Sequence, residues 1–128
     1  MVIVDTNIII DHLRQTRSLD TALERFMEIV EEDISLSVLS IQELFAGKSS
    51  RLNQNRERIL EVLSLFEIIP YSFEIAKTAG MLVRDLRNPI EFPDAAIAAT
   101  ALVYESSLLT LNHKDFAHIP GLRVYKLD

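Results

Sequence analysis

Short runs of branched apolar residues alternate along this chain with longer segments in which apolar residues recur every three or four positions. The short runs lie at residues 2–4, 34–39, 67–72, 107–111 and 122–127. Each run is too short for a buried helix, and most are rich in valine, isoleucine and leucine, which is typical of buried strands. The pattern therefore predicts four to five strands.

The longer segments predict helices, and local signals mark several of their ends. We expect helices within residues 7–14, 18–32, 40–48, 52–66, 73–87 and 93–105. Leu23 and Phe26 illustrate the helical spacing of apolar residues with charged residues between them. Ser72 is a predicted N-cap, Pro93 suits a first helical turn, and Gly47 is a predicted C-cap.

Strands that alternate with helices favour parallel pairing, because each helix carries the chain back over the sheet in a right-handed crossover. We therefore predict an α/β fold with a single domain over residues 1–128, in which a central parallel sheet of four to five strands is flanked by helices in three layers. In such sheets, functional side chains lie beyond the carboxyl ends of the strands.

Composition narrows the class of function only in part. The chain has 128 residues, no cysteine and a formal net charge of −6. The lack of cysteine excludes disulfides and thiolate-bound metals, and the negative charge argues against a broad basic surface that coats nucleic acid. No apolar stretch approaches the roughly 18 residues of a membrane span. We expect a soluble, cytoplasmic protein with no membrane partner.

Four acidic residues follow predicted strands or open the helices after them. Asp5 comes directly after the first strand, Glu43 follows the second, and Asp94 lies in the first turn of the helix at 93–105. The helix dipole stabilises an acid such as Asp94 at that position in any case. Asp115 follows the fourth strand and is spaced from Asn112 like a single capped turn.

The other two acids also have structural explanations. Asp5 is as well placed to cap the helix at 7–14 as to serve a site, and Asn7 could cap that helix instead. Ser40 and Glu43 have the spacing of a capping box, which is the interpretation that we favour for this pair taken alone.

As a set, these carboxylates indicate more than caps, because parallel strands would bring them to one edge of the sheet. At an effective dielectric constant near 20, two like charges about 4 Å apart repel by roughly 4 kcal/mol, so such a cluster either protonates or binds a cation. Mg²⁺ or Mn²⁺ suits a site with only oxygen ligands. The chemistry predicted for such a site is metal-assisted hydrolysis of phosphodiesters.

Five segments resemble one known family. The segments are "VDTN" at 4–7, "SIQELFAG" at 40–47, "PDAAIAATA" at 93–101, "LLTLNHKDF" at 108–116 and "IPGLRVY" at 119–125. Together they are similar to the PIN domain, specifically the VapC-type toxins of prokaryotic toxin–antitoxin pairs. The resemblance covers essentially the whole chain.

This resemblance implies a PIN-like fold and an endoribonuclease that depends on Mg²⁺ or Mn²⁺, forms a homodimer and is held inactive by a VapB-type antitoxin. It implies that Asp5, Glu43 and Asp94 are the catalytic, metal-binding acids. The supporting residues are expected to be Thr6, Asn7, Ser40 and Asn112. Many relatives have an aspartate where this chain has Asn112, so either Asp115 or the neutral Asn112 completes the site.

Other polar and aromatic residues are weaker candidates. The basic residues that could contact RNA phosphates are Arg14, Lys48, Arg84, Arg87 and Lys114. His113 and His118 are expected in exposed loops rather than as general acids. The aromatic residues expected to pack in the core or an interface are Tyr71, Phe73, Phe92 and Phe116.

Two other functions compete with that of a ribonuclease. A phosphatase with an aspartyl nucleophile would need a second aspartate where this chain has Asn7, and no glycine-rich nucleotide motif is present. The other function is that of a catalytically silent PIN-like module that acts through a protein partner, which the sequence also allows because most of the acids could be caps.

The apolar stripes at 18–32 and 52–66 predict a homodimer face and a groove for an antitoxin helix.

Overall fold

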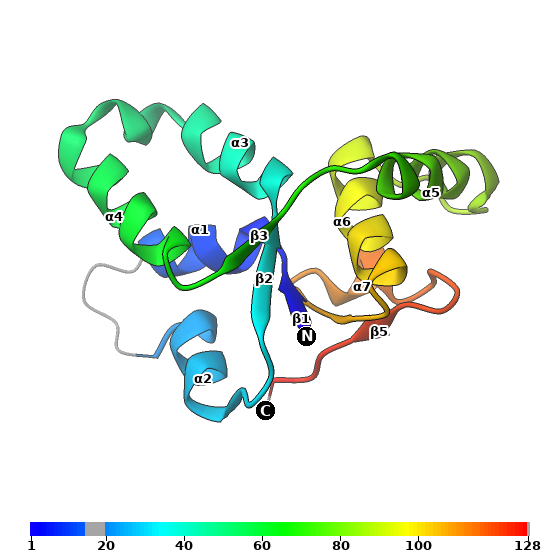
Figure 1. Cartoon of the computed structure of the whole chain (residues 1–128), viewed down its shortest axis with the longest axis horizontal. Coiled ribbons are helices and arrows are strands. Elements are labelled where there is room, and N and C mark those ends of the chain that lie inside the picture. The colour runs from blue at the N-terminus through cyan, green and yellow to red at the C-terminus, as the bar shows by residue number, and fades with distance from the viewer. Residues whose placement is uncertain (15–19, 128) are drawn as a thin grey trace.

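The structure, a computed structural model, describes residues 1–14 and 20–127. Within these residues a sheet of five strands is combined with seven α-helices and one 3₁₀-helix (Figure 1). The strands are β1 (Val2–Val4), β2 (Ile34–Ser37), β3 (Glu67–Ile69), β4 (Ser107–Leu109) and β5 (Arg123–Val124). The helices are α1 (Thr6–Arg14), α2 (Ala22–Ile29), α3 (Val38–Ala46), η1 (Lys48–Arg51), α4 (Asn53–Leu63), α5 (Phe73–Asp85), α6 (Phe92–Val103) and α7 (His113–Phe116). Every described helix is too short or too polar to cross a membrane.

The strands form one parallel sheet in the order β3-β2-β1-β4-β5. From the central strand β1 the chain moves outward through β2 to β3, and it then crosses to the other side of β1 to add β4 and β5. The direction in which strands are added to the sheet therefore reverses between β1 and β4. In parallel sheets, the crevice at such a reversal is the usual place for a ligand.

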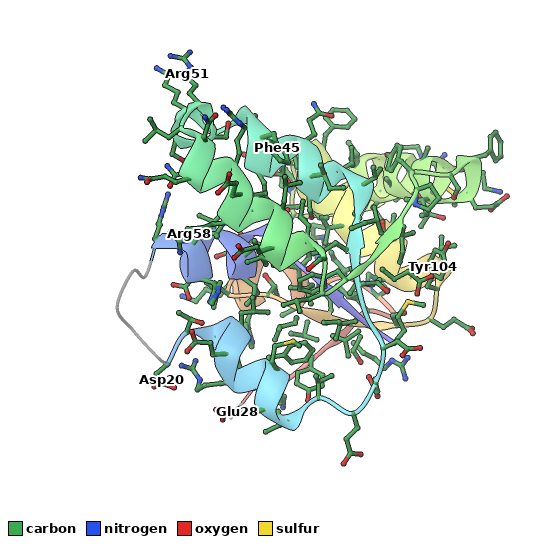
Figure 2. The ribbon with its side chains drawn as sticks, turned by 60° about the vertical axis from the view of Figure 1, so that its left-hand side comes forward. Asp20, Glu28, Phe45, Arg51, Arg58 and Tyr104 are labelled. Atoms are coloured by element: carbon green, nitrogen blue, oxygen red, sulfur yellow. The ribbon has the colours of Figure 1, made fainter. Side chains whose placement is uncertain are left out.

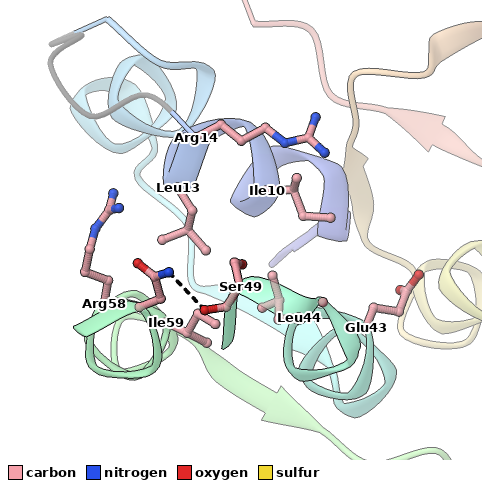
Figure 3. Close-up of a pocket in the computed structure, with 10 residues that line it drawn as sticks. Ile10, Leu13, Arg14, Glu43, Leu44, Ser49, Arg58 and Ile59 are labelled. Carbon is pink, nitrogen blue, oxygen red and sulfur yellow. Dashed lines mark hydrogen bonds between the residues drawn. The ribbon is translucent and has the colours of Figure 1, made fainter. Parts of the chain in front are cut away.

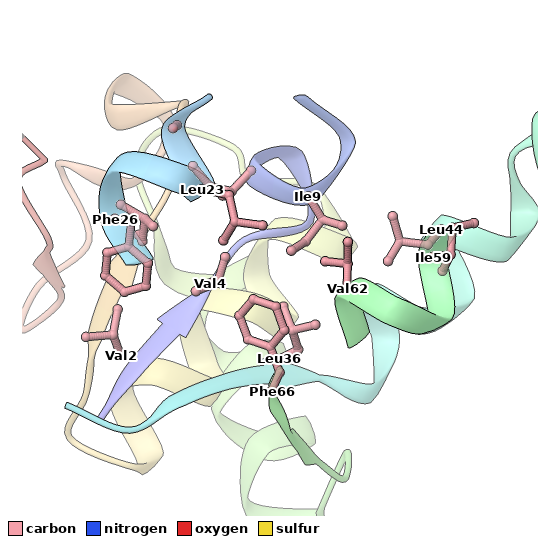
Figure 4. Packing of buried hydrophobic residues seen from close by; sticks show 13 residues of the cluster. Val2, Val4, Ile9, Leu23, Phe26, Leu36, Leu44, Ile59, Val62 and Phe66 are labelled. Carbon is pink, nitrogen blue, oxygen red and sulfur yellow. The ribbon is translucent and has the colours of Figure 1, made fainter. Parts of the chain in front are cut away.

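The sheet has one apolar cluster on each face, because successive strand residues point to opposite sides. Val2 and Val4 belong to the cluster under α1, α2 and α4, whereas Ile3 belongs to the cluster under α5 and α6. Figure 4 shows the first cluster, in which Phe26 and Leu23 of α2 pack over β1. These layers confirm the predicted three-layer α/β architecture.

Helix α6 lies close to the middle of the sheet because its buried face is made of small residues. Ala95, Ala98 and Ala99 are fully buried, and α6 contacts both β1 and β4. A methyl group is the largest side chain at these positions, so the helix axis can approach the strands closely. The start of α6, with Asp94 in its first turn, is thereby brought to the carboxyl end of β1.

Several element ends differ from the prediction. The strand predicted over 34–39 ends at Ser37, whose hydroxyl accepts a hydrogen bond from the Leu39 N–H and caps α3. The predicted start of the helix at 18–32 lies outside the described residues, and the described helix runs from Ala22 to Ile29 after the N-cap Thr21. The helix predicted over 52–66 is limited to Asn53–Leu63.

Other predicted ends are confirmed. Ser72 caps α5 by accepting a hydrogen bond from the Ile75 N–H, and Pro93 lies in the first turn of α6. Gly47 is the C-cap of α3, but its φ of −65° is open to any residue, so the left-handed freedom of glycine is not used there.

Candidate active site

The register of the sheet brings Asp5 and Thr110 together at the point where the strand order reverses. Val4 of β1 pairs with Leu109 of β4, and these are the last residues of the two strands. Asp5 directly follows Val4, and Thr110 directly follows Leu109. The Asp5 N–H donates to the Leu109 carbonyl at 2.8 Å, which extends the pairing by one residue. The two side chains therefore emerge side by side at the carboxyl edge of the sheet.

Thr110 is a buried hydroxyl that connects three parts of this edge. Its side chain is 2% exposed, and its Oγ1 donates to Asp5 Oδ2 at 2.8 Å. The same oxygen accepts hydrogen bonds from the Asn112 N–H at 3.0 Å and from Asn7 Nδ2 at 3.3 Å. Sequence reasoning missed Thr110, although it follows its strand just as Asp5 follows β1.

Asp5 combines the two roles that the sequence left open. Its carboxyl lies near the Thr6 and Asn7 N–H groups at the start of α1, which stabilise its charge, and it is also hydrogen-bonded by Thr110 and repelled by Glu43. Burial raises the pKa of Asp5 above its ordinary value, and repulsion from Glu43 adds to this, while the hydrogen bonds from Thr110 and the backbone oppose it. Asp5 is therefore a nearly buried carboxyl held in one orientation.

Thr6 joins Asp5 to the second helix of the site. Thr6 Oγ1 lies 2.7 Å from Ser40 Oγ and donates to Glu43 Oε1 at 2.8 Å. Ser40 and Glu43 are three residues apart on α3 and face the same direction, so both reach the same hydroxyl. The capping box predicted for this pair is wrong, because α3 begins at Val38 after the cap Ser37 and Ser40 lies buried inside the helix.

Asp94 is the carboxyl most affected by the other acids. It is half-buried in the first turn of α6, and its pKa is raised from 3.8 to about 6. Burial is the largest cause, followed by repulsion from Asp5, Asp115, Glu91 and Glu43. Carboxyls from α3, from α7, from the N-cap of α6 and from the end of β1 therefore lie close enough to Asp94 to affect its charge.

A polar depression of about 590 Å³ lies beside Asp94. The side chains along it include Glu91, Asp94, Asn112, Lys114, Asp115 and His118. Asn112 is the N-cap residue of α7 but makes no side-chain cap bond, and Asp115 is exposed one turn later. Both alternatives for the fourth position of the site thus face the same depression. Glu91 was not among the predicted residues, and the only signal for it was its place three residues before Asp94.

The basic residues predicted to contact RNA lie in different surroundings. Arg14 lines a pocket between α1, α3 and α4, and Lys114 lines the depression beside Asp94. Arg84 makes two hydrogen bonds, of 2.6 and 2.7 Å, to the aspartate that follows it in the chain. Lys48 and Arg87 are exposed, at the start of η1 and in the bend between α5 and α6.

The aromatic residues divide into two groups. Phe116 is fully buried in the cluster under α6, as predicted. Phe73 and Phe92 are 78% and 76% exposed, and Tyr71 is also exposed, so core packing is wrong for these three and an interface remains a prediction. His113 and His118 are exposed, as expected, but His113 is the first residue of α7 and does not lie in a loop.

The donor atoms of this edge suit a hard divalent cation, because every candidate ligand offers oxygen. The pKa of Asp94 is raised first by burial and then by repulsion from the neighbouring acids, and a cation would offset that repulsion. Among residues 1–14 and 20–127, no three acidic or histidine side chains already lie close enough to share one ion. The acids are thus neighbours at one edge rather than a closed coordination sphere.

This arrangement can perform chemistry on a negatively charged substrate if a cation balances the acids. Asp5 is fixed by Thr110, and Glu43 accepts a hydrogen bond from Thr6, so two carboxylates from separate elements are oriented. Lys114 places a positive charge in the depression beside Asp94. Such a set fits phosphodiester hydrolysis better than nucleophilic catalysis, which needs a nucleophile paired with a base.

Known sequences are similar to this chain over most of its length. Residues 2–122 match the PIN domain family. The protein named Ribonuclease VapC1 of Rickettsia felis is 41% identical over 98 residues, which cover 70% of this chain and 72% of the relative. Ribonuclease VapC of Rickettsia bellii is 34% identical over 126 residues, which cover 96% of this chain and 93% of the relative.

Solved structures agree with these sequences. A toxin–antitoxin complex from Klebsiella pneumoniae contains a chain with a TM-score of 0.78 and 30% identity, with 98% of this chain and 99% of that chain covered. VapBC2 from Rickettsia felis, bound to a DNA fragment from its promoter, contains a chain with a TM-score of 0.79 and 26% identity over the full length of both chains, 100% of each.

Proposed function

Because the chain belongs to the PIN domain family and is similar within it to the VapC ribonucleases, we propose that it is an endoribonuclease that hydrolyses RNA phosphodiester bonds as the toxin of a toxin–antitoxin pair. One observation of the structure carries this proposal. Asp5, Glu43 and Asp94 come from separate elements and converge at the reversal of the sheet, where Asp94 responds to the charges of the other acids.

The proposed cofactor is Mg²⁺ or Mn²⁺. Asp5, Glu43 and Asp94 would hold it, with Asp115 or Asn112 as the fourth oxygen donor. When bound, the cation supplies Lewis acidity and positive charge that offset the charge of the phosphate in the transition state. The chain's own residues set the geometry: Thr110 holds Asp5, while Thr6, itself hydrogen-bonded to Ser40, holds Glu43.

The remaining groups would position the substrate. Lys114 lies beside Asp94 and would contact a phosphate oxygen, which lowers the repulsion between the RNA and the acids. Glu43 is exposed, and within the described part of the chain it accepts a hydrogen bond from Thr6 alone, so its second oxygen can orient a water molecule for attack. Asp94, with a pKa near neutrality, can take up a proton at a carboxyl oxygen when no cation is bound.

The proposed partner is a VapB-type antitoxin. Similar chains occur in a toxin–antitoxin complex from Klebsiella pneumoniae and in VapBC2 from Rickettsia felis. This chain offers exposed apolar side chains on α4 and around it, including Leu52 and Leu60, both 57% exposed. An apolar segment of an antitoxin that covered them would remove this surface from water.

The test of the proposal is cleavage of single-stranded RNA by the purified chain. We expect cleavage with Mg²⁺ or Mn²⁺ and none with a chelator. Asp5→Asn and Asp94→Asn should each lower kcat by more than the roughly ten- to hundred-fold cost of losing a supporting group. Asp85→Asn is the matched control, because Asp85 is an exposed carboxyl paired with Arg84.

Metal titration separates this function from a silent binding module. A metal site predicts that Mn²⁺ raises the melting temperature of the native chain and not that of Asp94→Asn. If the acids serve only as caps, Mn²⁺ should leave the melting temperature unchanged, and mutation of an acid should lower the stability of the chain. Cleavage that persists without divalent metal, or in both variants, would contradict the proposed site.

A further inference from the structure

A second hollow adjoins the acids from the side of α1. It is a pocket of about 390 Å³ between α1, α3, η1 and α4, which we call the α1–α4 pocket (Figure 3). Its lining includes Ile10, Leu13, Arg14, Glu43, Asn55 and Arg58. Glu43 belongs both to this lining and to the hydrogen-bonded group around Thr6, so the pocket is continuous with the candidate active site.

The floor of the α1–α4 pocket is apolar. Leu13 and Ile10 lie one helical turn apart on α1 and face Leu44 and Ile59 from the opposite helices (Figure 3). Leu44 and Ile59 are buried, at 6% and 4% exposure, so their positions are fixed by the core. A flat apolar group that entered between them would displace water from both of its faces.

The rim of the pocket carries positive charge. Arg14 and Arg58 come from different helices and lie on either side of Leu13 in Figure 3. In residues 1–14 and 20–127 neither guanidinium forms an ion pair or a hydrogen bond, although the whole chain has a net charge of −6. Figure 2 shows Arg58 and Arg51 on this side of the molecule. Two arginines without counter-ions at one rim leave both guanidiniums available to an anionic ligand.

Asn55 adds a polar group with a fixed direction. Its Nδ2 donates to the Ser49 carbonyl at 2.9 Å, which fixes the amide plane. Its Oδ1 accepts nothing from the described part of the chain and can receive a hydrogen bond from a ligand. The pocket thus combines an apolar slot, one oriented acceptor and two cations, next to acids that would act on phosphate.

We propose that the α1–α4 pocket holds one unpaired nucleobase of the RNA, that of a nucleotide beside the scissile phosphate, with Arg14 and Arg58 on the adjacent phosphates. This rests on the proposed function. Unpaired bases are recognised by stacking on apolar or guanidinium surfaces and by hydrogen bonds to their edges, and the pocket offers all three. A protein segment would fill the apolar floor but would leave the two arginines without anionic partners.

The test uses a short single-stranded RNA that the native chain cuts at one place. Each nucleotide around the cut is replaced in turn by an abasic nucleotide, and kcat and KM are measured. We expect one position at which the missing base raises KM by about 5- to 100-fold, the effect of losing one stacked base. The other positions should change KM little.

Two variants assign this effect to the pocket. Leu13→Phe fills the slot, so it should raise KM for intact RNA and add no further penalty to the abasic RNA. Arg58→Ala keeps the slot but removes a phosphate contact, so it should raise KM for both RNAs and reduce the dependence of KM on salt. Arg51→Ala is the control, because Arg51 is exposed on η1 and does not line the pocket.

The outcomes are distinct. If the native chain cuts no RNA with metal present, the proposed function fails. If it cuts RNA but the abasic series is flat, or Leu13→Phe and the abasic change are additive, only the nucleobase pocket is overturned. It is also overturned if Leu13→Phe and Arg58→Ala leave the kinetics unchanged and weaken binding of a protein partner instead. Melting temperatures of both variants confirm that they fold.

Discussion

At the scale of single residues, Asp94 links the charge of the site to the stability of the chain. Its folded pKa of about 6 exceeds the ordinary value of 3.8, so the folded chain binds this proton more tightly than the unfolded chain. The contribution of Asp94 to the free energy of unfolding is therefore highest at low pH. It declines as the pH rises from about 4 through about 6.

We expect the metal-free chain to lose stability between pH 5 and pH 7.5. The loss from Asp94 should be on the order of 1 kcal/mol, because water around a half-buried carboxyl screens the repulsion, and it corresponds to roughly 3–5 °C in melting temperature. Thermal denaturation at each pH measures it. Asp94→Asn should reduce this slope and Asp85→Asn should not; an unchanged slope in Asp94→Asn would contradict the assignment.

Thr110 provides a test of how Asp5 is oriented. Thr110→Val has the same shape but no hydroxyl, so three polar groups lose their partner and the free energy of unfolding should fall by about 1–3 kcal/mol. Cleavage should show a kcat about 10- to 100-fold lower at nearly unchanged KM. Thr110→Ser keeps the hydroxyl and should retain most of the native free energy of unfolding and most of the native kcat. A native kcat in Thr110→Val would show that the hydroxyl has no role in positioning Asp5.

The contrast between Asp5 and Thr110 shows what the sequence could reveal about the site. Asp5, Glu43 and Asp94 could be selected because acids that follow strands share one edge of a parallel sheet. Thr110 carries no charge, and its partner is 105 positions away. Only the register of β1 against β4 places the two together, and the sequence does not encode that register in any local signal.

At the scale of elements, the start of α3 shows why helix ends were predicted less well than helices. Ser37 and Ser40 are both suitable caps by residue type, and Glu43 favoured Ser40. In the fold, Ser40 is buried against Thr6, so the helix has to begin one turn earlier. A tertiary contact therefore outweighed a local motif.

The cap of α5 is isolated from the site and allows a clean test of local stabilisation. Ser72→Ala removes the acceptor for the Ile75 N–H and should lower the free energy of unfolding by about 1 kcal/mol. Ser72→Asp keeps an acceptor and should retain native stability. Chemical denaturation measures both, and RNA cleavage should be native in each; equal stability of Ser72→Ala and the native chain would contradict the capping role.

At the scale of the whole molecule, the sheet and its layers were predictable, but the strand order was not. Buried apolar runs and intervening helices suffice to predict parallel pairing. The placement of β4 beside β1 depends on the close packing of α6, whose alanines contact both strands. Such packing is a property of the folded layers, and no periodic pattern of residues in the sequence predicts it.

The homodimer stays a prediction, and exposed apolar side chains on the surface of the molecule support it. Ile29 and Leu60 are 54% and 57% exposed, and they belong to the stripes predicted to form an interface. Sedimentation velocity at high micromolar concentration should show a dimer, with roughly 800 Å² buried on each chain. Ile29→Glu should weaken it, and Glu28→Gln, which changes a neighbouring exposed polar residue, should not. A native chain that sediments as a monomer would contradict the dimer.

The hydrogen bond from Thr110 to Asp5 also has a consequence for synthesis. A ribosome adds Thr110 105 residues after Asp5, and the exit tunnel covers the residues made most recently. The edge that would cut RNA is therefore completed only after residue 110 has left the exit tunnel. A nascent chain of the proposed nuclease is expected to be inert until then, and truncated translation products that end before residue 110 are expected to be harmless.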